Sequence, residues 1–137
     1  MKKLAVSFFV LFLASCSGTG KKSAVLFQEI KTAHTQIFVK RQTGHPRLLS
    51  LIQITLNGTE IGKLKEKGRL SGSTEVGSGV LSARFTGLSS IGISSVSRPF
   101  TIKKGEKLFF IITQEVGMFL KRLKIYPIKQ SDFFADR

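Results

Sequence analysis

The chain carries few side chains suited to covalent chemistry, and its only cysteine, Cys16, is the most informative of them. A lone thiol cannot form a disulfide within the chain, so the folded part must be stabilised by its core. Lys2, Lys3 and an apolar run over residues 4–14 precede Cys16, and this order is typical of a secretory signal. Because a membrane-spanning helix needs about 20 apolar residues, the run predicts export and not a permanent span.

The four residues Leu13-Ala14-Ser15-Cys16 resemble the lipobox of bacterial lipoproteins, in which an aliphatic residue and two small residues precede a cysteine. The resemblance implies that residues 1–15 are removed as a signal peptide and that Cys16 is acylated with fatty acids such as palmitate. An ordinary signal peptide with an incidental cysteine is the alternative interpretation. One acyl chain binds a membrane only marginally, at about 0.8 kcal/mol per buried CH₂, so the several chains of a lipoprotein would form a lasting anchor.

The residue after the cysteine bears on where such an anchor would reside. By resemblance to enteric lipoproteins, an aspartate there implies retention at the inner membrane, whereas this chain has Ser17. The expected location is therefore the bacterial cell envelope, lipid-anchored at the outer membrane and facing the periplasm, with the leaflet left open.

The other residue types that perform catalysis are scarce or scattered. His34 and His45 lie eleven positions apart in expected loops or strand edges, and a zinc or copper site would need more ligands. A glycosidase needs two carboxyl groups across a cleft, and no such pair stands out among the eight acidic residues. The serine pairs at 89–90 and 94–95 lack a nucleophile-elbow context. We therefore expect no enzymatic activity, no metal ion and no cofactor.

The chain is strongly basic, with 22 Lys and Arg against 8 Asp and Glu. Loss of Lys2 and Lys3 with the signal leaves 20 basic residues against 8 acidic ones, a net charge of +12. Export argues against nucleic acid as the partner, and no recognisable nucleic-acid module accompanies the charge. Anionic lipid headgroups would attract each basic residue near the surface by about 1 kcal/mol; an acidic glycan, an acidic protein or simple solvation would also explain the charge. The residues expected at such a contact are Lys63, Lys65, Lys67, Arg69, Lys103, Lys104, Lys121, Arg122 and Lys124.

Residues 16–34 are expected to form a lipidated N-terminus, a tether and a lead-in to the folded domain. Residues 17–23 are small or polar, and seven extended residues span at most about 25 Å, so the domain is expected to sit close to the membrane. Val25, Leu26 and Ile30 fit either one face of a short helix or an extended segment that packs on the domain. Of the two, the extended form is preferred here.

Residues 35–137 carry the patterns of a β domain. Apolar and polar residues alternate over 52–57, Asn57-Gly58 predicts a tight hairpin, and residues 61–64 form the return strand. The continuous apolar run Leu108–Ile112 predicts a strand at the centre of a sheet. Further strands are expected at 37–39, at 81–85 after a turn over 77–79, at 100–102, and at 123–127, where Pro127 ends the strand. About seven short strands without a long helix predict an all-β fold, a small β-sandwich.

The phenylalanines outside the signal are expected to serve mainly as core. The five expected on strands are Phe38, Phe85, Phe100, Phe109 and Phe110. Phe133-Phe134 is expected to dock on the sheet, with a partner contact as the alternative. Residues 118–120 precede the basic pair Lys121-Arg122 and suggest an exposed hydrophobic and basic edge.

Four segments of residues 35–127 resemble a family of small bacterial lipoproteins with a PEGA-like or transthyretin-like β domain, a family without an assigned function. They are the strand 37–41 ending in Arg, the hairpin 54–64 with Asn-Gly followed by Ile-Gly, the turn at 79–83 and the turn and strand at 104–110. Such domains often have Pro-Gly before the third strand, where this chain has Ser78-Gly79. The resemblance implies a surface-anchored binding or structural module and supplies no catalytic residues.

Together these patterns predict a membrane-anchored, non-enzymatic envelope lipoprotein whose basic β domain has a binding or structural role. The alternative is an inhibitor or immunity-type protein that blocks an acidic enzyme or toxin; an envelope hydrolase is a third hypothesis. The expected organisation is a signal peptide at 1–15, the tether and lead-in at 16–34, and the β-sandwich domain at 35–137. The ligand, the oligomeric state and the role of the Ser/Gly-rich segment 88–98 stay open.

Overall fold

The computed structural model describes residues 23–42, 51–86, 95–116 and 121–135, which form eight β-strands and two short helices. The strands are β1 (Gln36–Arg41), β2 (Ile52–Leu56), β3 (Thr59–Leu64), β4 (Arg69–Ser73), β5 (Gly77–Phe85), β6 (Val96–Ile102), β7 (Lys107–Val116) and β8 (Lys121–Ile128). The helices are α1 (Ser23–Ile30) and α2 (Gln130–Phe134). The prediction of an all-β sandwich is confirmed.

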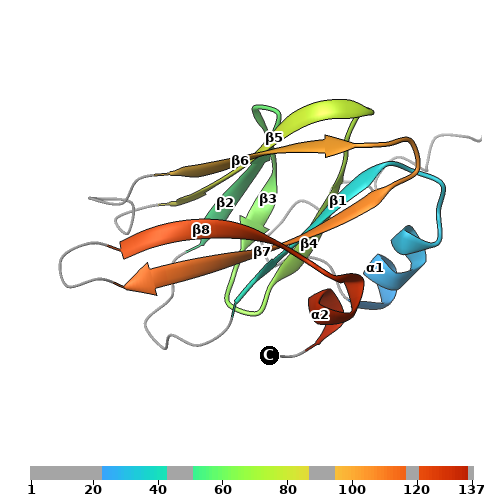
Figure 1. The fold of residues 1–137 in the computed structure, drawn as a ribbon. Coiled ribbons are helices and arrows are strands. Elements are labelled where there is room, and N and C mark those ends of the chain that lie inside the picture. The colour runs from blue at the N-terminus through green and yellow to red at the C-terminus, as the bar shows by residue number, and fades with distance from the viewer. Residues whose placement is uncertain (1–22, 43–50, 87–94, 117–120, 136–137) are drawn as a thin grey trace, which may run out of the picture.

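The strands form two four-stranded sheets, which we call sheet A (β4-β1-β7-β8) and sheet B (β3-β2-β5-β6) (Figure 1). Sheet B is antiparallel throughout. In sheet A, β1 pairs parallel with β7, and the two outer pairs are antiparallel. Parallel neighbours require a long connection, and the segment between β1 and β7 supplies all four strands of sheet B as well as β4. The predicted central strand, Leu108–Ile112, lies within β7 between β1 and β8.

The main hydrophobic core fills the space between the two sheets. Alternate residues of β2, Ile52, Ile54 and Leu56, are buried there, as their period-two pattern predicts. The phenylalanines that reach this core are Phe85, Phe100 and Phe110. The Asn57-Gly58 turn joins β2 to β3 as predicted, with positive φ angles of 51° and 85°.

A second core lies on the outer face of sheet A, where both helices pack (Figure 1). The ring centroid of Phe133 in α2 lies 5.8 Å from that of Phe38 and 5.3 Å from that of Phe109, and Phe133 is fully buried. Leu26 of α1 completes this cluster and is also fully buried. The expected docking of Phe133 on the sheet is therefore confirmed, as is the core position of Phe38 and Phe109.

Two basic side chains hold the end of α2 against sheet A. Lys40 Nζ donates to the carbonyl oxygens of Asp132 at 2.5 Å and Ala135 at 3.0 Å. Arg69 Nε donates to the carbonyl oxygen of Phe133 at 2.9 Å, and Arg69 Nη2 donates to that of Ala135 at 3.2 Å. The last carbonyls of a helix lack partners within it and carry partial negative charge. Lys40 and Arg69 satisfy them, which explains how a helix of five residues stays ordered.

The lead-in segment differs from the preferred extended form, because Ser23–Ile30 is α-helical. Leu26 and Ile30 are one helical turn apart and face the second core, while Glu29 accepts a hydrogen bond from Ser71 Oγ in β4. Short helices are stabilised mainly by packing of one apolar face. The contact with sheet A therefore decides a conformation that the local residues leave open.

Three further details of the strands differ from expectation. Residues 77–79 begin β5 and do not form a turn, and Gly77 supplies the positive φ of 115° at its start. Pro127 lies inside β8, which continues to Ile128; β8 is an edge strand, where a missing N–H is tolerated. The sequence pattern does not predict the eighth strand, β4, because Leu70 is its only large apolar residue.

We predict that Phe133→Ala lowers the free energy of unfolding by about 3–5 kcal/mol, because it empties a fully buried site among aromatic rings. Phe27→Ala is the matched control: Phe27 is 47% exposed, so its loss should cost about 1 kcal/mol. Urea denaturation of both variants measures the difference. Equal losses would contradict the assignment of Phe133 to a second core.

Candidate functional site

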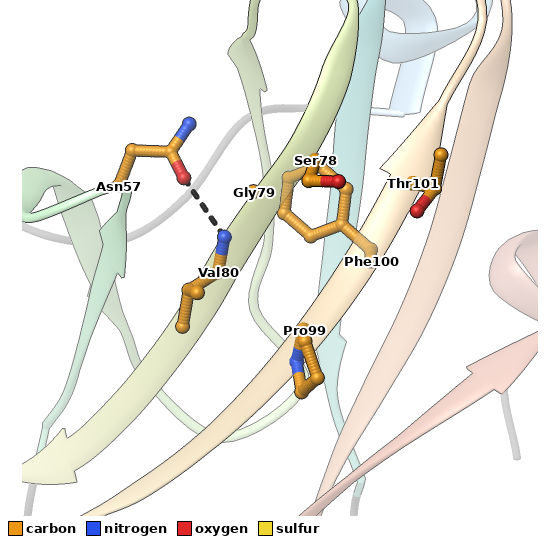
Figure 2. Close-up of a pocket in the computed structure, with 7 residues that line it drawn as sticks. All are labelled: Asn57, Ser78, Gly79, Val80, Pro99, Phe100 and Thr101. Atoms are coloured by element: carbon orange, nitrogen blue, oxygen red, sulfur yellow. Dashed lines mark hydrogen bonds between the residues drawn. The ribbon is translucent and has the colours of Figure 1, made fainter.

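An open depression lies where β5 and β6 pass the β2–β3 turn, at one end of sheet B (Figure 2). Its volume is about 610 Å³. The residues that line it are Asn57, Ser78, Gly79, Val80, Pro99, Phe100 and Thr101. They come from three segments that are distant in sequence and are aligned by the antiparallel pairing of β5 with β2 and β6.

Asn57 fixes the turn against β5. Its backbone N–H donates to the carbonyl oxygen of Val80 at 2.9 Å, and its side-chain Oδ1 accepts from the N–H of Val80 at 2.8 Å (Figure 2). Asn57 Nδ2 in turn lies 3.4 Å from Thr74 Oγ1, just beyond β4. The amide side chain therefore extends the β2–β5 ladder by one residue and links the turn to the other sheet.

Gly79 makes room for the aromatic ring behind the depression. A Cβ atom on Gly79 would lie 2.5 Å from Phe100 Cζ and 2.8 Å from Asn57 Oδ1, which are distances that side chains do not adopt. The Phe100 ring is 9% exposed and packs on Phe110 across the sandwich, with 6.4 Å between the ring centroids. The absence of a side chain at Gly79 therefore allows Phe100 and Asn57 to approach the backbone of β5 this closely.

The lining of the depression combines apolar side chains with hydroxyl groups. Val80, Pro99 and the Phe100 ring supply apolar contact, while Ser78 and Thr101 supply hydroxyl groups. None of the seven lining residues titrates near neutral pH, so the depression offers no general acid or base. Such a surface suits a neutral group that is held by contact and hydrogen bonds.

The histidine and cysteine predictions are only partly addressed by the structure. His34 is exposed after α1, and its backbone carbonyl accepts a hydrogen bond from Lys107 Nζ. Cys16, His45 and residues 118–120 lie outside the described residues. Within the described ranges, no group of three or more His, Cys, Asp and Glu side chains is arranged to hold a metal ion. No helix in this part of the chain is long and apolar enough to cross a membrane.

The structure distributes the predicted basic contact residues over both ends of the sandwich. Lys103 and Lys104 lie in the β6–β7 turn, at the end that also carries the Asn57-Gly58 turn. Lys65 and Lys67 lie in the β3–β4 turn at the opposite end. Arg69, Lys63, Arg122 and Lys124 belong to strand segments near that second end, as does Lys121, whose side chain lies outside the described residues.

Two of these basic residues already have defined partners. Arg69 holds the carbonyls of α2. Lys124 Nζ lies 3.0 Å from Glu115 Oε1 on the neighbouring strand, and the hydrogen bond and charge of Glu115 raise the pKa of Lys124. Both side chains of this pair are exposed, so Lys124 stays accessible to solvent and to other charges. Exposed ion pairs of this kind contribute little to stability.

Two basic residues that were not among the predicted contact residues are buried at the end of β1. Lys40 and Arg41 are 5% and 4% exposed. Arg41 Nη1 donates to the carbonyl oxygen of Leu64 at 3.1 Å, and its guanidinium lies 6.0 Å from the centre of the Phe85 ring. Burial lowers the pKa of Arg41, and the charge of Glu66 opposes the shift. These two residues hold strands and helix together and are not part of a contact surface.

No protein-family model and no curated protein sequence matches this chain. The resemblance to PEGA-like lipoproteins therefore stays a prediction.

We predict that Asn57→Ala lowers the free energy of unfolding by about 2 kcal/mol, since alanine disfavours the positive φ and leaves the Val80 N–H without its acceptor. Asn57→Asp keeps an acceptor oxygen and tolerates the same φ, so it should lose less than half as much. Urea denaturation of both variants checks this, and amide exchange at Val80 reports the bond directly. An equal loss in both variants would contradict the role assigned to Asn57 Oδ1.

Proposed function

We propose that this protein is a lipid-anchored bacterial envelope lipoprotein, without enzymatic activity, whose β-sandwich binds a partner through sheet B. The observation that carries the anchor is the motif Leu13-Ala14-Ser15-Cys16 at the end of a basic and apolar signal. Several acyl chains on one cysteine would make membrane attachment lasting. The first helix of the folded part begins at Ser23, within a short tether of Cys16.

The different covering of the two sheets supports the choice of sheet B as the binding face. Both helices lie on the outer face of sheet A, so that face is occupied by the protein itself (Figure 1). On sheet B, Val80 is 41% exposed, and Pro99 and Thr101 are also exposed. The depression opens among the same residues.

Two pairs of polar side chains on the outer face of sheet B are hydrogen-bonded to each other. Ser82 and Ser97 share a hydrogen bond of 2.9 Å between their hydroxyl oxygens. Arg84 Nε donates to Gln53 Oε1 at 2.6 Å. A partner that covers these four side chains would leave them hydrogen-bonded to each other. Buried donors and acceptors without partners are a main cost of polar interfaces, and these pairs avoid that cost.

A second candidate function is inhibition of an acidic enzyme or toxin. It is favoured by the exposed basic residues Lys65, Lys67 and Arg122, which belong to two hairpins at the same end of the sandwich. Basic clusters of this kind accelerate association with an acidic partner. The contact would then lie at the end of the sandwich and not on the face of sheet B.

We predict that Cys16→Ser abolishes incorporation of radioactive palmitate and moves the protein from the membrane fraction to the soluble fraction. The hydroxyl of serine does not replace the thiol that the acyl chain requires. Ser17→Ala is the matched control and should keep both labelling and membrane attachment. A wild-type protein that takes up no label would overturn the lipoprotein proposal.

Photo-crosslinking in intact cells separates the two candidate functions. A crosslinking residue in place of Thr101 should capture a partner on sheet B, whereas one in place of Lys67 should capture less. If Lys67 captures one dominant acidic protein and Thr101 does not, the inhibitor function replaces the sheet B proposal. Crosslinking at neither position above the background of an exposed reference position, Val76, would contradict both.

A further inference from the structure

The outer edge of β6 is open to a further strand. β6 is the last strand of sheet B, and within the described ranges no strand pairs with its outer side. It pairs with β5 along all seven of its residues, with Val80 opposite Pro99. An unpaired edge presents backbone N–H and C=O groups, and an extended segment of another chain can add to it as a new strand.

The hydrogen bonds of Val80 show which backbone groups of β6 face outward. The N–H and the C=O of Val80 are both bonded to Asn57, on the side of β5 that faces β2. In an antiparallel ladder both groups of a residue point to one side, and successive residues alternate. Pro99, opposite Val80, therefore directs its carbonyl away from β5, as do Ser97 and Thr101. The outer edge thus offers three carbonyls and the N–H groups of Ser97 and Thr101.

Two other edges of the sandwich are less suited to an added strand. In β8, the edge strand of sheet A beside β6, the carbonyl oxygen of Ile125 accepts from Arg98 Nη1 at 3.2 Å. β3, the opposite edge of sheet B, has a bulge at Ile61, because Glu60 and Gly62 pair with consecutive residues of β2. Bulges and groups that cover the backbone protect an edge from further pairing. β6 combines a free edge with regular pairing.

Pro99 limits what can pair with this edge. Proline has no N–H, so the middle of the edge accepts a hydrogen bond and donates none. If two copies of β6 paired antiparallel about Pro99, the two prolines would lie opposite each other and neither carbonyl would meet a donor. The excess of positive charge would also make two copies repel each other. A segment of different sequence, with an N–H opposite Pro99, meets neither obstacle.

The charges around the edge suit an acidic segment. β5, β6 and β8 carry no acidic residue, and their basic residues are Arg84, Arg98, Lys121, Arg122 and Lys124. Arg84 and Arg98 are bonded to uncharged acceptors, Gln53 and the carbonyl of Ile125, so their charges are not neutralised there. In the turns at the far end of β6, Lys103 and Lys104 match Glu75 and Glu106 in number. Complementary charge favours encounter with an acidic chain.

The depression lies on the outer face of sheet B beside the same edge. Pro99 and Thr101 line it from β6, and Val80 lines it from β5 (Figure 2). In an added strand, the residue opposite Pro99 or Thr101 would have its Cβ atom about 4.5–5.5 Å away on the same face. Its side chain would therefore border the depression, and the apolar groups of Val80, Pro99 and Phe100 suit an apolar side chain there.

We infer that β6 binds an extended acidic segment of the partner protein along its outer edge, with an apolar side chain of that segment in the depression. This inference rests on the proposed function and specifies the partner and its mode of binding. The backbone groups of Ser97, Pro99 and Thr101 bond to the main chain of the segment. Its acidic side chains meet the basic residues of β6 and β8.

Peptides selected on the protein test this mode of binding. The full-length protein in detergent micelles selects binders from a displayed library of short random peptides, and we expect the binders to be rich in Asp and Glu around an apolar residue. Thr101→Pro removes an outward N–H and places a ring on the edge, without removing a donor to β5. Thr101→Val is the matched control, because it keeps the N–H and removes only the hydroxyl group.

Fluorescence anisotropy of a labelled selected peptide measures the affinity. We expect Thr101→Pro to weaken binding at least about tenfold, because a hydrogen bond is lost and the ring blocks the added strand, and Thr101→Val to change it by less than about twofold. Circular dichroism checks that the variants are folded. Amide exchange in the unsubstituted protein needs no variant, and it should slow at Ser97 and Thr101 when the peptide is bound.

Three results would overturn the inference. The first is a set of peptides that bind Thr101→Pro as tightly as the natural protein or carry no acidic excess. The second is a concentration-dependent dimer of the free protein that Thr101→Pro dissociates, since a second copy would then occupy the edge. The third is a selection that yields no binder. None of these decides the proposed function, which crosslinking at Thr101 and palmitate labelling at Cys16 test without any peptide.

Discussion

The structure depends on one strand, β1, whose six residues are all buried. Ile37 and Val39 enter the core between the sheets, while Phe38 enters the core beneath the helices. β4 pairs along one edge of β1 and β7 along the other. A strand that is enclosed on both faces and both edges can shift register only by breaking both cores at once, so it fixes the positions of the other elements.

The burial of β1 also explains where two basic side chains lie. A charged group under a layer of helix must be hydrogen-bonded to offset its loss of hydration. Lys40 meets this requirement at the carbonyls of α2, and Arg41 donates to Leu64 across the sandwich. The first contact holds the helix layer on sheet A. That layer is the physical reason the two outer faces of the sandwich differ.

The positions of most strands along the chain could be predicted from local residues. The alternation over β2 and the Asn57-Gly58 turn depend on residues near in sequence, and both are present as expected. The helix at Ser23–Ile30 could not be decided in this way, since its apolar spacing fits two conformations and its contact with sheet A selects one. The depression could not be predicted from the sequence either, because the close approach of Gly79, Phe100 and Asn57 joins segments that are far apart in the chain.

Residues near one another in the sequence were enough to predict the all-β class, the hairpin at 57–58 and the interior strand around Leu108–Ile112, and the composition gives the excess of positive charge. These features follow from backbone preferences and side-chain periodicity, which act between near neighbours. The covering of one sheet face, the burial of Lys40 and the stacking of Phe27 on Phe134 are visible in the folded structure alone. These features depend on contacts between residues that are far apart in the sequence and meet only in the folded sandwich.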